Sequence, residues 1–500
     1  MFRIFMIVFF LAATAVAQPL VFDTTVVTTS GDLARFHVQI PSGYDAARPP
    51  AILVGWHALG GTEVEIFAQL YDEICDERGW IIVSHMGPND RHWNTRLPQV
   101  HCRTMLEWIE ARYPFSRDSI YMCGGSMGAA AGQVWHNNNC AYDDYLIAAT
   151  AGGSMILDTQ LRQEQYLASG DTNRSMRVAF GGFPFESDSI AYEYHRYSAV
   201  FFADTTESMH FNALTVPVWS NWGDTQAEWD AYGYPAFNLS VLRTGGAESR
   251  FFPASWVAHG FGTMVTEDVC AWFAQHSVNR FPDTLALAAD EDGRYYYCDV
   301  VLGDAAYTFA RADVRKDAAA KRLDIALLRN VAELTVNFAF PWTDVDTLRC
   351  HWHNADPAAG EPVVRLAGLS EDLVAVMNGV PVQAVSADGE LSFLVESDTN
   401  FTLTFMEVHP PAPVLLPSEI EIESAYPNPF NGQLGLTIAS RDSRAIVIQF
   451  FDVLGRLAAS RPATLAAGRN RLILTLPELG SGAYWTRAGD SAPVRVVLVR

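Results

Sequence analysis

The segment Ser119-Ile120-Tyr121-Met122-Cys123-Gly124-Gly125-Ser126-Met127-Gly128 constrains the fold more than any other part of the sequence. Apolar, β-prone residues lead into a Gly-x-Ser-x-Gly pattern, and small residues at 129–132 follow it. This order predicts a strand, a sharp turn and a helix. Small neighbours let the backbone reverse, and the following helix N-terminus favours developing negative charge near the serine. The pattern alone is weak, but its flanks make Ser126 a candidate nucleophile.

Continuous apolar runs precede this segment and alternate with amphipathic stretches. Residues 51–56 and 80–84 are apolar throughout, which is typical of strands covered on both faces. Residues 62–78 and 100–113 have apolar positions at helical spacing. Residues 33–40 alternate apolar and polar side chains, as a half-buried antiparallel strand would. The pattern predicts an α/β fold with a mostly parallel sheet and crossover helices.

The same pattern resumes after the candidate nucleophile, with one long interruption. Residues 145–151, 216–220 and 251–256 are the next predicted strands, and residues 265–278 are a predicted closing helix. Residues 155–212 show no clean period and are rich in polar and aromatic residues. An insertion of this length between strands is often functional, so we expect it to form a lid over the site.

A serine nucleophile needs a base and an acid, and chain order identifies candidates for both. When the serine lies in such a strand–turn–helix, the acid and then the histidine come from loops after later strands. Asp224 follows the strand at 216–220, with Asp230 as its competitor. His259 follows the strand at 251–256 and lies beside glycines. The predicted catalytic residues are therefore Ser126, Asp224 and His259.

The oxyanion of a tetrahedral intermediate needs two backbone donors. One is expected from the residue after the nucleophile, Met127, and the other from a loop after an earlier strand. His57-Ala58-Leu59-Gly60-Gly61 follows the strand at 51–56, and Leu59 is the predicted second donor. A plain Gly-Gly turn is the alternative interpretation of that loop.

Residues 33–280 resemble the secreted esterases grouped with polyhydroxybutyrate depolymerases and feruloyl esterases, a branch of the α/β-hydrolases. The resemblance implies an α/β-hydrolase fold and a Ser-His-Asp triad, and it makes Trp93 a candidate for stacking on substrate; a tryptophan anchored in the core is the alternative. That family often has His-Gly where this chain has His57-Ala58. The residues that carry the resemblance are His57-Ala58-Leu59-Gly60-Gly61, Trp93-Asn94, Gly124-Gly125-Ser126-Met127-Gly128, Asp224 and His259-Gly260-Phe261.

The N-terminus and the charge balance bear on location and partners. Arg3, an apolar core at 4–16 and the ending Ala15-Val16-Ala17 predict a signal peptide at 1–17 and an exported chain. No later segment is long and apolar enough to predict a membrane span. The balance of 34 basic against 57 acidic residues argues against nucleic acid or an anionic membrane as a partner.

The seven cysteines are too sparse for a disulfide scaffold, and their odd number leaves at least one thiol free. Cys123, in a predicted buried strand, is our candidate for the free thiol, and a bridge between Cys298 and Cys350 is one candidate pairing. The sequence has no Cys-x-x-Cys pair or His/Cys spacing that suggests zinc. The predicted serine chemistry requires no cofactor.

The texture changes after the catalytic domain, which we predict to span residues 18–282. Residues 283–410 contain short β-prone runs separated by turns, which predicts a small antiparallel sandwich of unknown role. Residues 411–417 are a Pro-rich linker. Residues 418–500 again contain short strands and turns, which predicts a second small all-β domain.

The last predicted domain contains Ala425-Tyr426-Pro427-Asn428-Pro429-Phe430-Asn431, Phe451-Asp452-Val453-Leu454-Gly455-Arg456 and Gly480-Ser481-Gly482-Ala483-Tyr484-Trp485. Together these segments resemble the C-terminal sorting domain of the type IX secretion system, which implies that secretion machinery as a partner. A carbohydrate-binding module is the alternative.

The sequence thus predicts a secreted serine esterase, outside the cell or at its outer surface. The expected substrate is an ester-bearing polymer or oligomer, either feruloyl or acetyl esters of plant polysaccharide or a polyhydroxyalkanoate-type polyester. A serine peptidase on the same fold and a catalytically inactive glycan-binding surface protein are the alternatives.

Overall fold

The computed structural model describes residues 18–337, 347–355, 361–369, 373–377, 380–384, 389–395, 399–407 and 420–500. The predicted signal peptide at 1–17 and the predicted linker at 411–417 lie outside the described residues. The chain divides into two compact units, and each is described below by itself. The first unit comprises residues up to 379 together with 384–405, and the second comprises 380–383 and 406–500.

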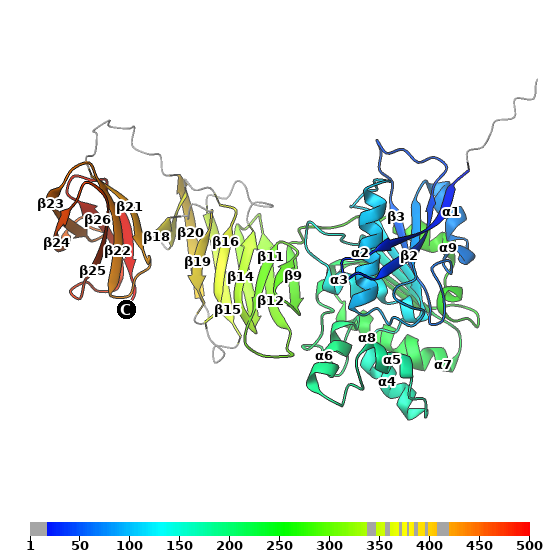
Figure 1. Ribbon diagram of the computed structural model, residues 1–500. Helices are drawn as coiled ribbons and strands as arrows, with labels where there is room; N and C mark the ends of the chain where they lie inside the picture. The colour runs from blue at the N-terminus through cyan, green and yellow to red at the C-terminus, as the bar shows by residue number, and fades with distance from the viewer. Residues whose placement is uncertain are drawn as a thin grey trace, which may run out of the picture. The chain divides into compact units, whose positions relative to one another are not determined.

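An eight-stranded sheet organises the first part of the chain (Figure 1). Its spatial order is β1-β2-β4-β3-β5-β6-β7-β8. The β1–β2 and β2–β4 pairs are antiparallel, and all later pairs are parallel, which confirms the predicted α/β architecture. The strands are β1 (Leu20–Val27), β2 (Leu33–Ile40), β3 (Ile52–Trp56), β4 (Ile81–His85), β5 (Ile120–Gly125), β6 (Ala149–Gly153), β7 (Val218–Trp222) and β8 (Ser249–Pro253).

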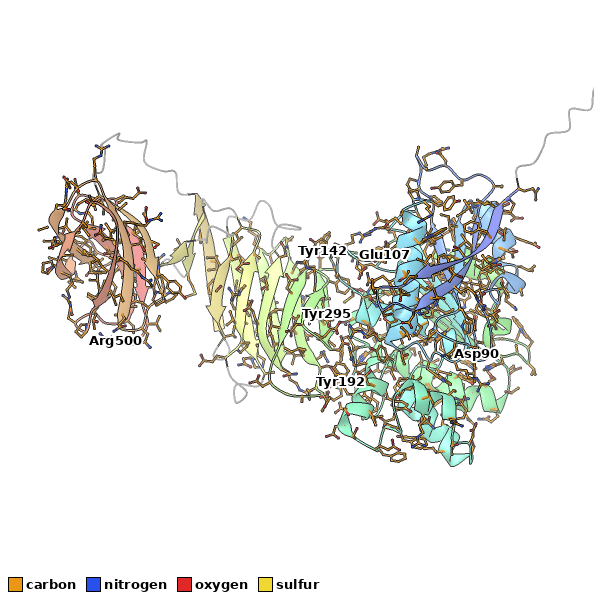
Figure 2. The ribbon with its side chains drawn as sticks, in the orientation of Figure 1. Asp90, Glu107, Tyr142, Tyr192, Tyr295 and Arg500 are labelled. Atoms are coloured by element: carbon orange, nitrogen blue, oxygen red, sulfur yellow. The ribbon has the colours of Figure 1, made fainter. Side chains whose placement is uncertain are left out.

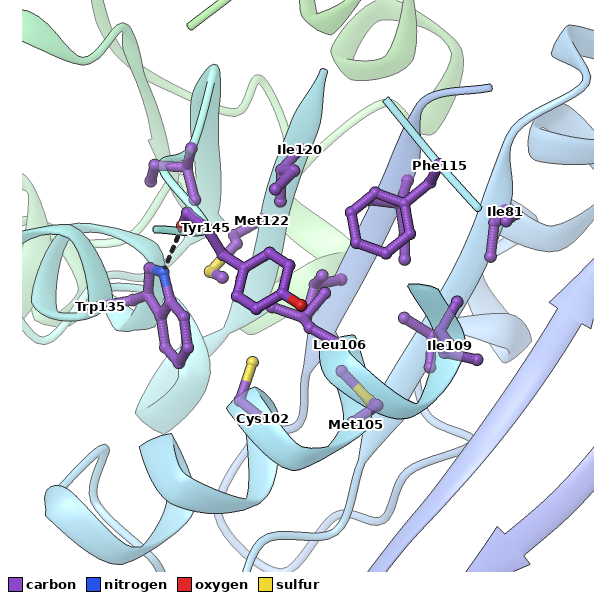
Figure 3. Packing of buried hydrophobic residues seen from close by; sticks show 14 of the residues in the cluster. Ile81, Cys102, Met105, Leu106, Ile109, Phe115, Ile120, Met122, Trp135 and Tyr145 are labelled. Carbon is purple, nitrogen blue, oxygen red and sulfur yellow. Dashed lines mark hydrogen bonds between the residues drawn. The ribbon is translucent and has the colours of Figure 1, made fainter. Parts of the chain in front are cut away.

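Helices cover both faces of this sheet, because its central strands are apolar on both sides. In β3, Ile52 and Val54 belong to a core cluster with α2 and α3, whereas Leu53 belongs to a cluster with α1 and α9. Figure 3 shows the first of these clusters, where Met105 and Ile109 of α2 lie among the same buried side chains as residues of β5. The helices are α1 (Tyr71–Arg78), α2 (Arg96–Glu110), α3 (Ala131–Asn138), α4 (Thr159–Ala168), α5 (Arg174–Ala179), α6 (Asp188–Arg196), α7 (Gln226–Glu228), α8 (Tyr234–Leu242) and α9 (Thr266–Phe273).

The bounds of several elements differ from the prediction. The helix predicted from Thr62 begins only at Tyr71, because Leu70 adopts a left-handed conformation (φ 64°) that interrupts the helix. The strand predicted at 145–151 is β6 and lies at Ala149–Gly153. The insertion at 155–212 contains α4, α5 and α6, although its sequence shows no clean helical period.

Two further sheets follow the eight-stranded sheet, and they are compatible with the predicted β-rich domain. One holds β10, β11, β14, β16 and β19 in spatial order, and the other includes β9, β12, β13, β15, β20 and β17. Most pairs are antiparallel, but β13 pairs with β15, and β14 with β16, in parallel. The strands are β9 (Thr284–Ala289), β10 (Gly293–Tyr295), β11 (Cys298–Leu302), β12 (Ala310–Asp317), β13 (Arg322–Arg329), β14 (Val331–Asn337), β15 (Thr347–Asn354), β16 (Val363–Ala367), β17 (Leu373–Met377), β18 (Val380–Ala384), β19 (Leu391–Leu394) and β20 (Thr399–Glu407).

Buried polar contacts join these sheets to the region around the eight-stranded sheet. The Asn212 side chain pairs with the backbone of Ala288 in β9, donating to its carbonyl (2.7 Å) and accepting from its N–H (2.8 Å). The fully buried Tyr296 hydroxyl contacts Nε2 of His136 at 2.6 Å and also Thr215. Backbone-like pairing and a buried tyrosine fix the relative position of the two regions.

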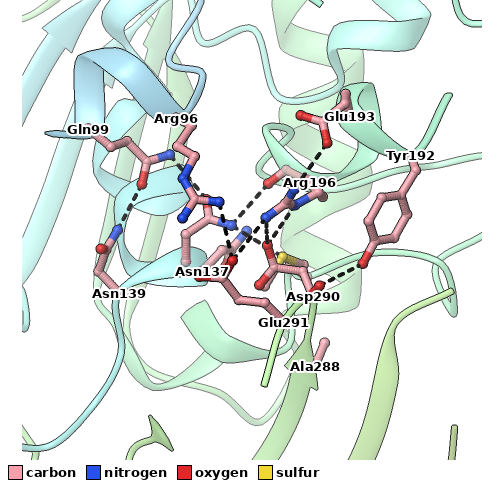
Figure 4. A network of polar contacts seen from close by, with 12 residues as sticks. Arg96, Gln99, Asn137, Asn139, Tyr192, Glu193, Arg196, Ala288, Asp290 and Glu291 are labelled. Carbon is pink, nitrogen blue, oxygen red and sulfur yellow. Dashed lines mark hydrogen bonds and ion pairs between the residues drawn. The ribbon is translucent and has the colours of Figure 1, made fainter. Parts of the chain in front are cut away.

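An ion pair at the same junction is largely buried (Figure 4). Arg196 of α6 donates from Nε to Oδ2 of Asp290 at 2.7 Å, and the two side chains are 14% and 4% exposed. Tyr192 donates to the Asp290 carbonyl (3.1 Å), and Tyr295 donates to its carboxylate (2.9 Å); both tyrosines are labelled in Figure 2. The carboxylate of Asp290 is therefore paired within the protein instead of being hydrated.

We expect Arg196→Ala to lower the free energy of unfolding by about 3 kcal/mol, because it leaves a buried carboxylate without its charged partner. Arg177→Ala is the matched control, since Arg177 forms an exposed ion pair with Glu186 (3.4 Å). Loss of that pair should cost less than about 1 kcal/mol. Urea unfolding followed by tryptophan fluorescence measures both values. Equal losses for the two variants would contradict a special role for the buried pair.

The second unit holds a three-stranded sheet, β21-β22-β25, and a four-stranded sheet, β24-β23-β26-β27. One apolar core fills it, with Leu434, Leu436 and Ile438 of β22 fully buried. This arrangement supports the predicted small all-β domain at 418–500. The strands are β21 (Ile420–Tyr426), β22 (Gln433–Ser440), β23 (Arg444–Phe451), β24 (Leu457–Leu465), β25 (Gly468–Thr475), β26 (Gly482–Ala488) and β27 (Val494–Leu498).

All seven cysteines are buried and free. Cys123 is therefore free, as predicted. The candidate bridge between Cys298 in β11 and Cys350 in β15 is not formed, since both thiols are free. No helix among the described residues is long and apolar enough to cross a membrane.

Candidate active site

Ser126 lies at a sharp turn between β5 and α3. The strand ends at Gly125, and Ser126 has a φ of 50°, a left-handed conformation that a residue with a side chain rarely adopts. Strain of this kind is held in place only by the surrounding structure and is concentrated at functional sites. The predicted strand, turn and helix are all present.

Close backbone contacts explain the two outer glycines of the Gly-x-Ser-x-Gly pattern. A Cβ atom on Gly124 would lie 2.1 Å from the Gly128 carbonyl oxygen. A Cβ atom on Gly128 would lie 2.4 Å from the carbonyl oxygen of Trp56, at the end of β3. Both distances are shorter than any van der Waals contact, so the turn can close over β3 only with glycine at these positions.

His259 and Glu228 complete a hydrogen-bonded chain with the serine. Nε2 of His259 is 2.8 Å from Oγ of Ser126, and Nδ1 of His259 is 2.7 Å from Oε1 of Glu228. Because a carboxylate only accepts, Nδ1 carries the proton, and Nε2 is left free to accept the serine hydroxyl proton. The order and contacts are those that nucleophilic catalysis by a serine requires.

Glu228 is held in its charged form. Burial raises the pKa of its carboxyl group, but hydrogen bonds from His259, Ser154 and the Gly223 N–H outweigh burial and hold the pKa below its ordinary value. The side chain of Glu228 is 12% exposed, whereas that of His259 is 48% exposed. A charged, sheltered carboxylate therefore faces the Nδ1 side of an accessible imidazole.

The predicted acid, Asp224, does not contact His259, so this prediction is wrong. Asp224 lies in the turn after β7, where its side chain is exposed and its backbone N–H donates to the Trp256 carbonyl (3.0 Å). Thr225 then caps α7 by accepting from the N–H of Glu228 (3.1 Å). The helical turn brings Glu228 back beneath His259. Asp230, the competitor, is exposed and accepts from Gln226.

Ser154 supports both Glu228 and the histidine loop, and no sequence signal indicated it. Its hydroxyl donates to Oε2 of Glu228 (2.7 Å) and accepts from the N–H of Gly260 (3.0 Å). The residue is fully buried at the end of β6 and has a φ of 54°. Ser154 is therefore a positioning residue for the hydrogen-bonded chain.

We expect Ser154→Ala to lower kcat/KM on a short p-nitrophenyl ester about tenfold, roughly 1.4 kcal/mol, because Glu228 loses a donor and the Gly260 N–H loses its acceptor. Ser198→Ala is the matched control, since Ser198 is a buried serine that accepts from the N–H of Thr159, away from Ser126. The control should lose stability but keep kcat/KM within about twofold. If both variants lost activity equally, the effect would be one of stability alone.

The loop after β3 presents a free backbone donor at Leu59. The Ala58 carbonyl accepts from the Gly61 N–H (2.9 Å) and lies 2.8 Å from Nδ1 of His57. Since the N–H and C=O of one peptide point in opposite directions, the Leu59 N–H points away from these contacts. Among the described residues it has no hydrogen-bond acceptor. This geometry favours the predicted oxyanion donor over a plain Gly-Gly turn.

Alanine at position 58 is compatible with this loop. Ala58 is absent from the residues with positive φ, whereas Gly60 has a φ of 78° and requires glycine. The Ala58 N–H donates to Oε2 of Glu65 at 2.8 Å, which holds the start of the loop in place. The departure from the His-Gly pattern of the resembled family therefore leaves the donor geometry intact.

Met127, the residue that carries the other predicted donor, is held through its carbonyl. The Asn94 amide donates to the Met127 carbonyl at 2.8 Å. Trp93 is only 2% exposed, packs in a core cluster with Met127 and donates from Nε1 to Ser175 (3.0 Å). The prediction that Trp93 stacks on substrate is therefore corrected: the core alternative holds, because a buried ring cannot meet a ligand.

The insertion at 155–212 is linked to His259 through Tyr232, a residue outside the insertion. Arg162 of α4 donates to the hydroxyl of Tyr232 at 3.0 Å, and the Tyr232 ring lies 5.3 Å from the His259 ring. A role for the insertion as a lid stays a prediction. No group of three or more His, Cys, Asp or Glu side chains that could hold a metal ion occurs in the part of the chain that the structure describes.

Comparison with known families identifies the tail. Residues 424–496 match the family model described as the secretion system C-terminal sorting domain. The predicted type IX sorting tail is thereby confirmed, and it indicates a secreted or cell-surface protein. A search of curated protein sequences finds no significant match.

Several solved structures are similar to about half of the chain. An S-formylglutathione hydrolase from Agrobacterium tumefaciens is 11% identical over 52% of this chain and 96% of its own, with a TM-score of 0.38. A ferulic acid esterase is 15% identical over 51% of this chain and 96% of its own, with a TM-score of 0.37. A putative dipeptidyl aminopeptidase IV from Bacteroides ovatus is 14% identical over 52% and 36%, also with a TM-score of 0.38. The order and pairing of the strands identify the α/β architecture by themselves.

Proposed function

We propose that the chain is a secreted serine hydrolase that cleaves carboxylic esters through an acyl-enzyme. The observation that carries this proposal is the hydrogen-bonded chain from Ser126 through His259 to Glu228. Each member has the partner that its chemical role needs, and the serine sits in the strained turn typical of such nucleophiles.

In the proposed reaction, Ser126 Oγ attacks the ester carbonyl while His259 Nε2 accepts its proton. Glu228 stabilises the imidazolium that forms, and the N–H groups of Leu59 and Met127 bind the oxyanion. His259 then donates the proton to the leaving alcohol. Water, deprotonated by the same imidazole, hydrolyses the acyl-enzyme and releases the acid.

The resemblance to feruloyl esterases and polyhydroxybutyrate depolymerases supports a polymeric or oligomeric ester as substrate. The sorting tail supports a location where such polymers are found. The proposed substrates are feruloyl or acetyl esters of plant polysaccharide, or an aliphatic polyester.

A fluorophosphonate probe tests the proposal directly. We expect wild-type protein to be labelled on Ser126, and His259→Ala to be labelled far more slowly because the serine loses its base. Absence of labelling on the folded wild-type protein would favour the inactive glycan-binding alternative. A panel of feruloyl, acetylated-xylan, polyhydroxybutyrate and peptide substrates then identifies the bond cleaved. Cleavage of the peptide alone would show that the protein is a peptidase and not an esterase.

A further inference from the structure

A cavity of about 550 Å³ lies between the loop after β4 and helix α5 of the insertion. We call it the α5 pocket, and Arg91, Thr95, Arg174, Ser175 and Val178 are among its lining residues. Its volume falls within the range of small-molecule binding sites, roughly 300–1,000 Å³. None of the three residues of the hydrogen-bonded chain lines it.

One lining residue of the α5 pocket is hydrogen-bonded to the proposed oxyanion loop. The carbonyl of Asp90, a lining residue labelled in Figure 2, accepts from the Gly60 N–H at 2.8 Å. Gly60 directly follows Leu59, the proposed donor. A group bound in the pocket would therefore contact Asp90, whose carbonyl is hydrogen-bonded to the loop that holds one of the two proposed oxyanion donors.

Two consecutive strained residues join the pocket to Met127, the residue that carries the other proposed donor. Trp93 and Asn94 have φ values of 50° and 55°. Trp93 bonds to Ser175 in the pocket wall, and Asn94 bonds to the carbonyl of Met127. Consecutive left-handed residues are costly and persist where the surroundings fix them, which is common beside functional sites. The loop that contains Trp93 and Asn94 therefore contacts the pocket wall through Trp93 and contacts Met127, the residue after Ser126, through Asn94.

The pocket carries positive charge in a chain whose formal net charge is −23. Arg91 lies 3.7 Å from the Asp90 carboxylate, so its charge is partly balanced. Arg174 has no carboxylate within ion-pair distance in the described part of the chain. By contrast, Arg177 on the same helix pairs with Glu186. Arg174 is therefore the lining cation that is available to a ligand.

The other lining residues indicate which further groups a ligand of the pocket would carry. Burial lowers the pKa of His92 well below its ordinary value, so this lining residue is neutral and adds no charge. Val178 is 73% exposed and, with Leu97, gives the pocket an apolar side. A carboxylate attached to a short aliphatic or aromatic group matches one guanidinium beside an apolar wall.

We propose that the α5 pocket is a substrate subsite that binds a carboxylate on the ester, and that Arg174 determines this specificity. This proposal rests on the proposed esterase function, and it places the charged group away from the scissile bond. The carboxylate belongs either to the acyl part or to the alcohol part of the ester, and these two sources are distinguished by experiment.

Two pairs of esters test the subsite. For the acyl part, mono-p-nitrophenyl glutarate is compared with p-nitrophenyl butyrate, and for the alcohol part, 4-acetoxybenzoate is compared with phenyl acetate. We expect Arg174→Gln to lower kcat/KM about fivefold, through KM, for the charged ester of one pair, and less than about twofold for its neutral partner. Added salt should reduce the difference.

Arg177→Gln is the matched control and should leave kcat/KM unchanged for all four esters. Equal effects of Arg174→Gln on charged and neutral esters in both pairs would overturn the proposal. Calorimetric titration of the wild type and Arg174→Gln with 3-phenylpropanoate and with 3-phenylpropan-1-ol tests the carboxylate subsite separately from the proposed esterase function. If wild type hydrolyses none of the esters, the esterase proposal fails. Selective binding of the carboxylate that requires Arg174 then upholds the subsite, and absence of such binding refutes it.

Discussion

Glu228→Gln is expected to lower kcat about 10⁴-fold, whereas Asp224→Asn should change it by less than about twofold. The reason lies in the contacts on the far side of the carboxylate. Oε2 of Glu228 accepts from the Ser154 hydroxyl and from the Gly223 N–H (3.2 Å). These two donors favour oxygen at that position, so the glutamine NH₂ group would face His259.

An NH₂ group at Nδ1 requires that nitrogen to accept, which moves the ring proton to Nε2. Nε2 would then face Ser126 as a donor and could not accept the hydroxyl proton. The expected loss is therefore in kcat, with KM little changed, because the defect arises in the chemical step.

Asp224→Asn is the matched control, since it makes the same acid-to-amide change four residues earlier on an exposed side chain. Steady-state hydrolysis of a short p-nitrophenyl ester measures both variants. A large loss for Asp224→Asn together with an active Glu228→Gln would show that the acid assigned from the geometry is not the acid used in turnover.

Ser126→Ala should abolish nearly all turnover, with a loss of about 10⁶-fold in kcat. The proposed mechanism has no second nucleophile, since the imidazole of His259 then has no hydroxyl to activate. Residual hydrolysis above the rate in water, of the order of 10³-fold, is expected from the oxyanion donors and from substrate binding.

The Ser126→Ala variant should also be slightly more stable than the wild type, because alanine removes a polar group from a mostly buried turn. The variant should therefore lose kcat while its free energy of unfolding in urea rises slightly. The fluorophosphonate probe should no longer label the variant. Wild-type rates from a folded Ser126→Ala protein would exclude the acyl-enzyme mechanism.

Local sequence patterns predicted the parts of the site that depend on backbone geometry. Ser126 and the N–H of Met127 follow from a turn that only small neighbours permit, and His259 follows from a strand end and flanking glycines. The Leu59 loop follows from its position after β3. In each case a few adjacent residues determine the conformation, so the signal is contained in a short stretch of sequence.

The acid could not be identified in this way. Thr225-Gln226-Ala227-Glu228 matches the Ser/Thr-x-x-Glu pattern that caps helix N-termini, and Thr225 does cap α7. Such a glutamate is ordinarily expected to return to the N-cap backbone. Here the Glu228 side chain instead contacts His259 and Ser154. These contacts depend on strands β6 and β8, which are distant from Glu228 in the sequence and position Ser154 and His259.

The helices of the insertion did leave a signal that hydrophobic periodicity does not detect. Asp158, Asn173 and Ser187 each accept a hydrogen bond from the backbone N–H three residues later, at the starts of α4, α5 and α6. Side-chain caps therefore mark all three N-termini. Each of these helices is short and buries only one or two of its residues, so few positions are available to reveal a helical period.

The junction around Asn212 and Tyr296 has a consequence for how this protein can be divided or recombined. A cut at residue 282 agrees with the change in sequence texture, but it would remove Ala288 from Asn212 and Tyr296 from His136. Further along, Arg311 of β12 lies over the Phe211 ring. The smallest piece that keeps the hydrolase region intact therefore extends at least through Arg311.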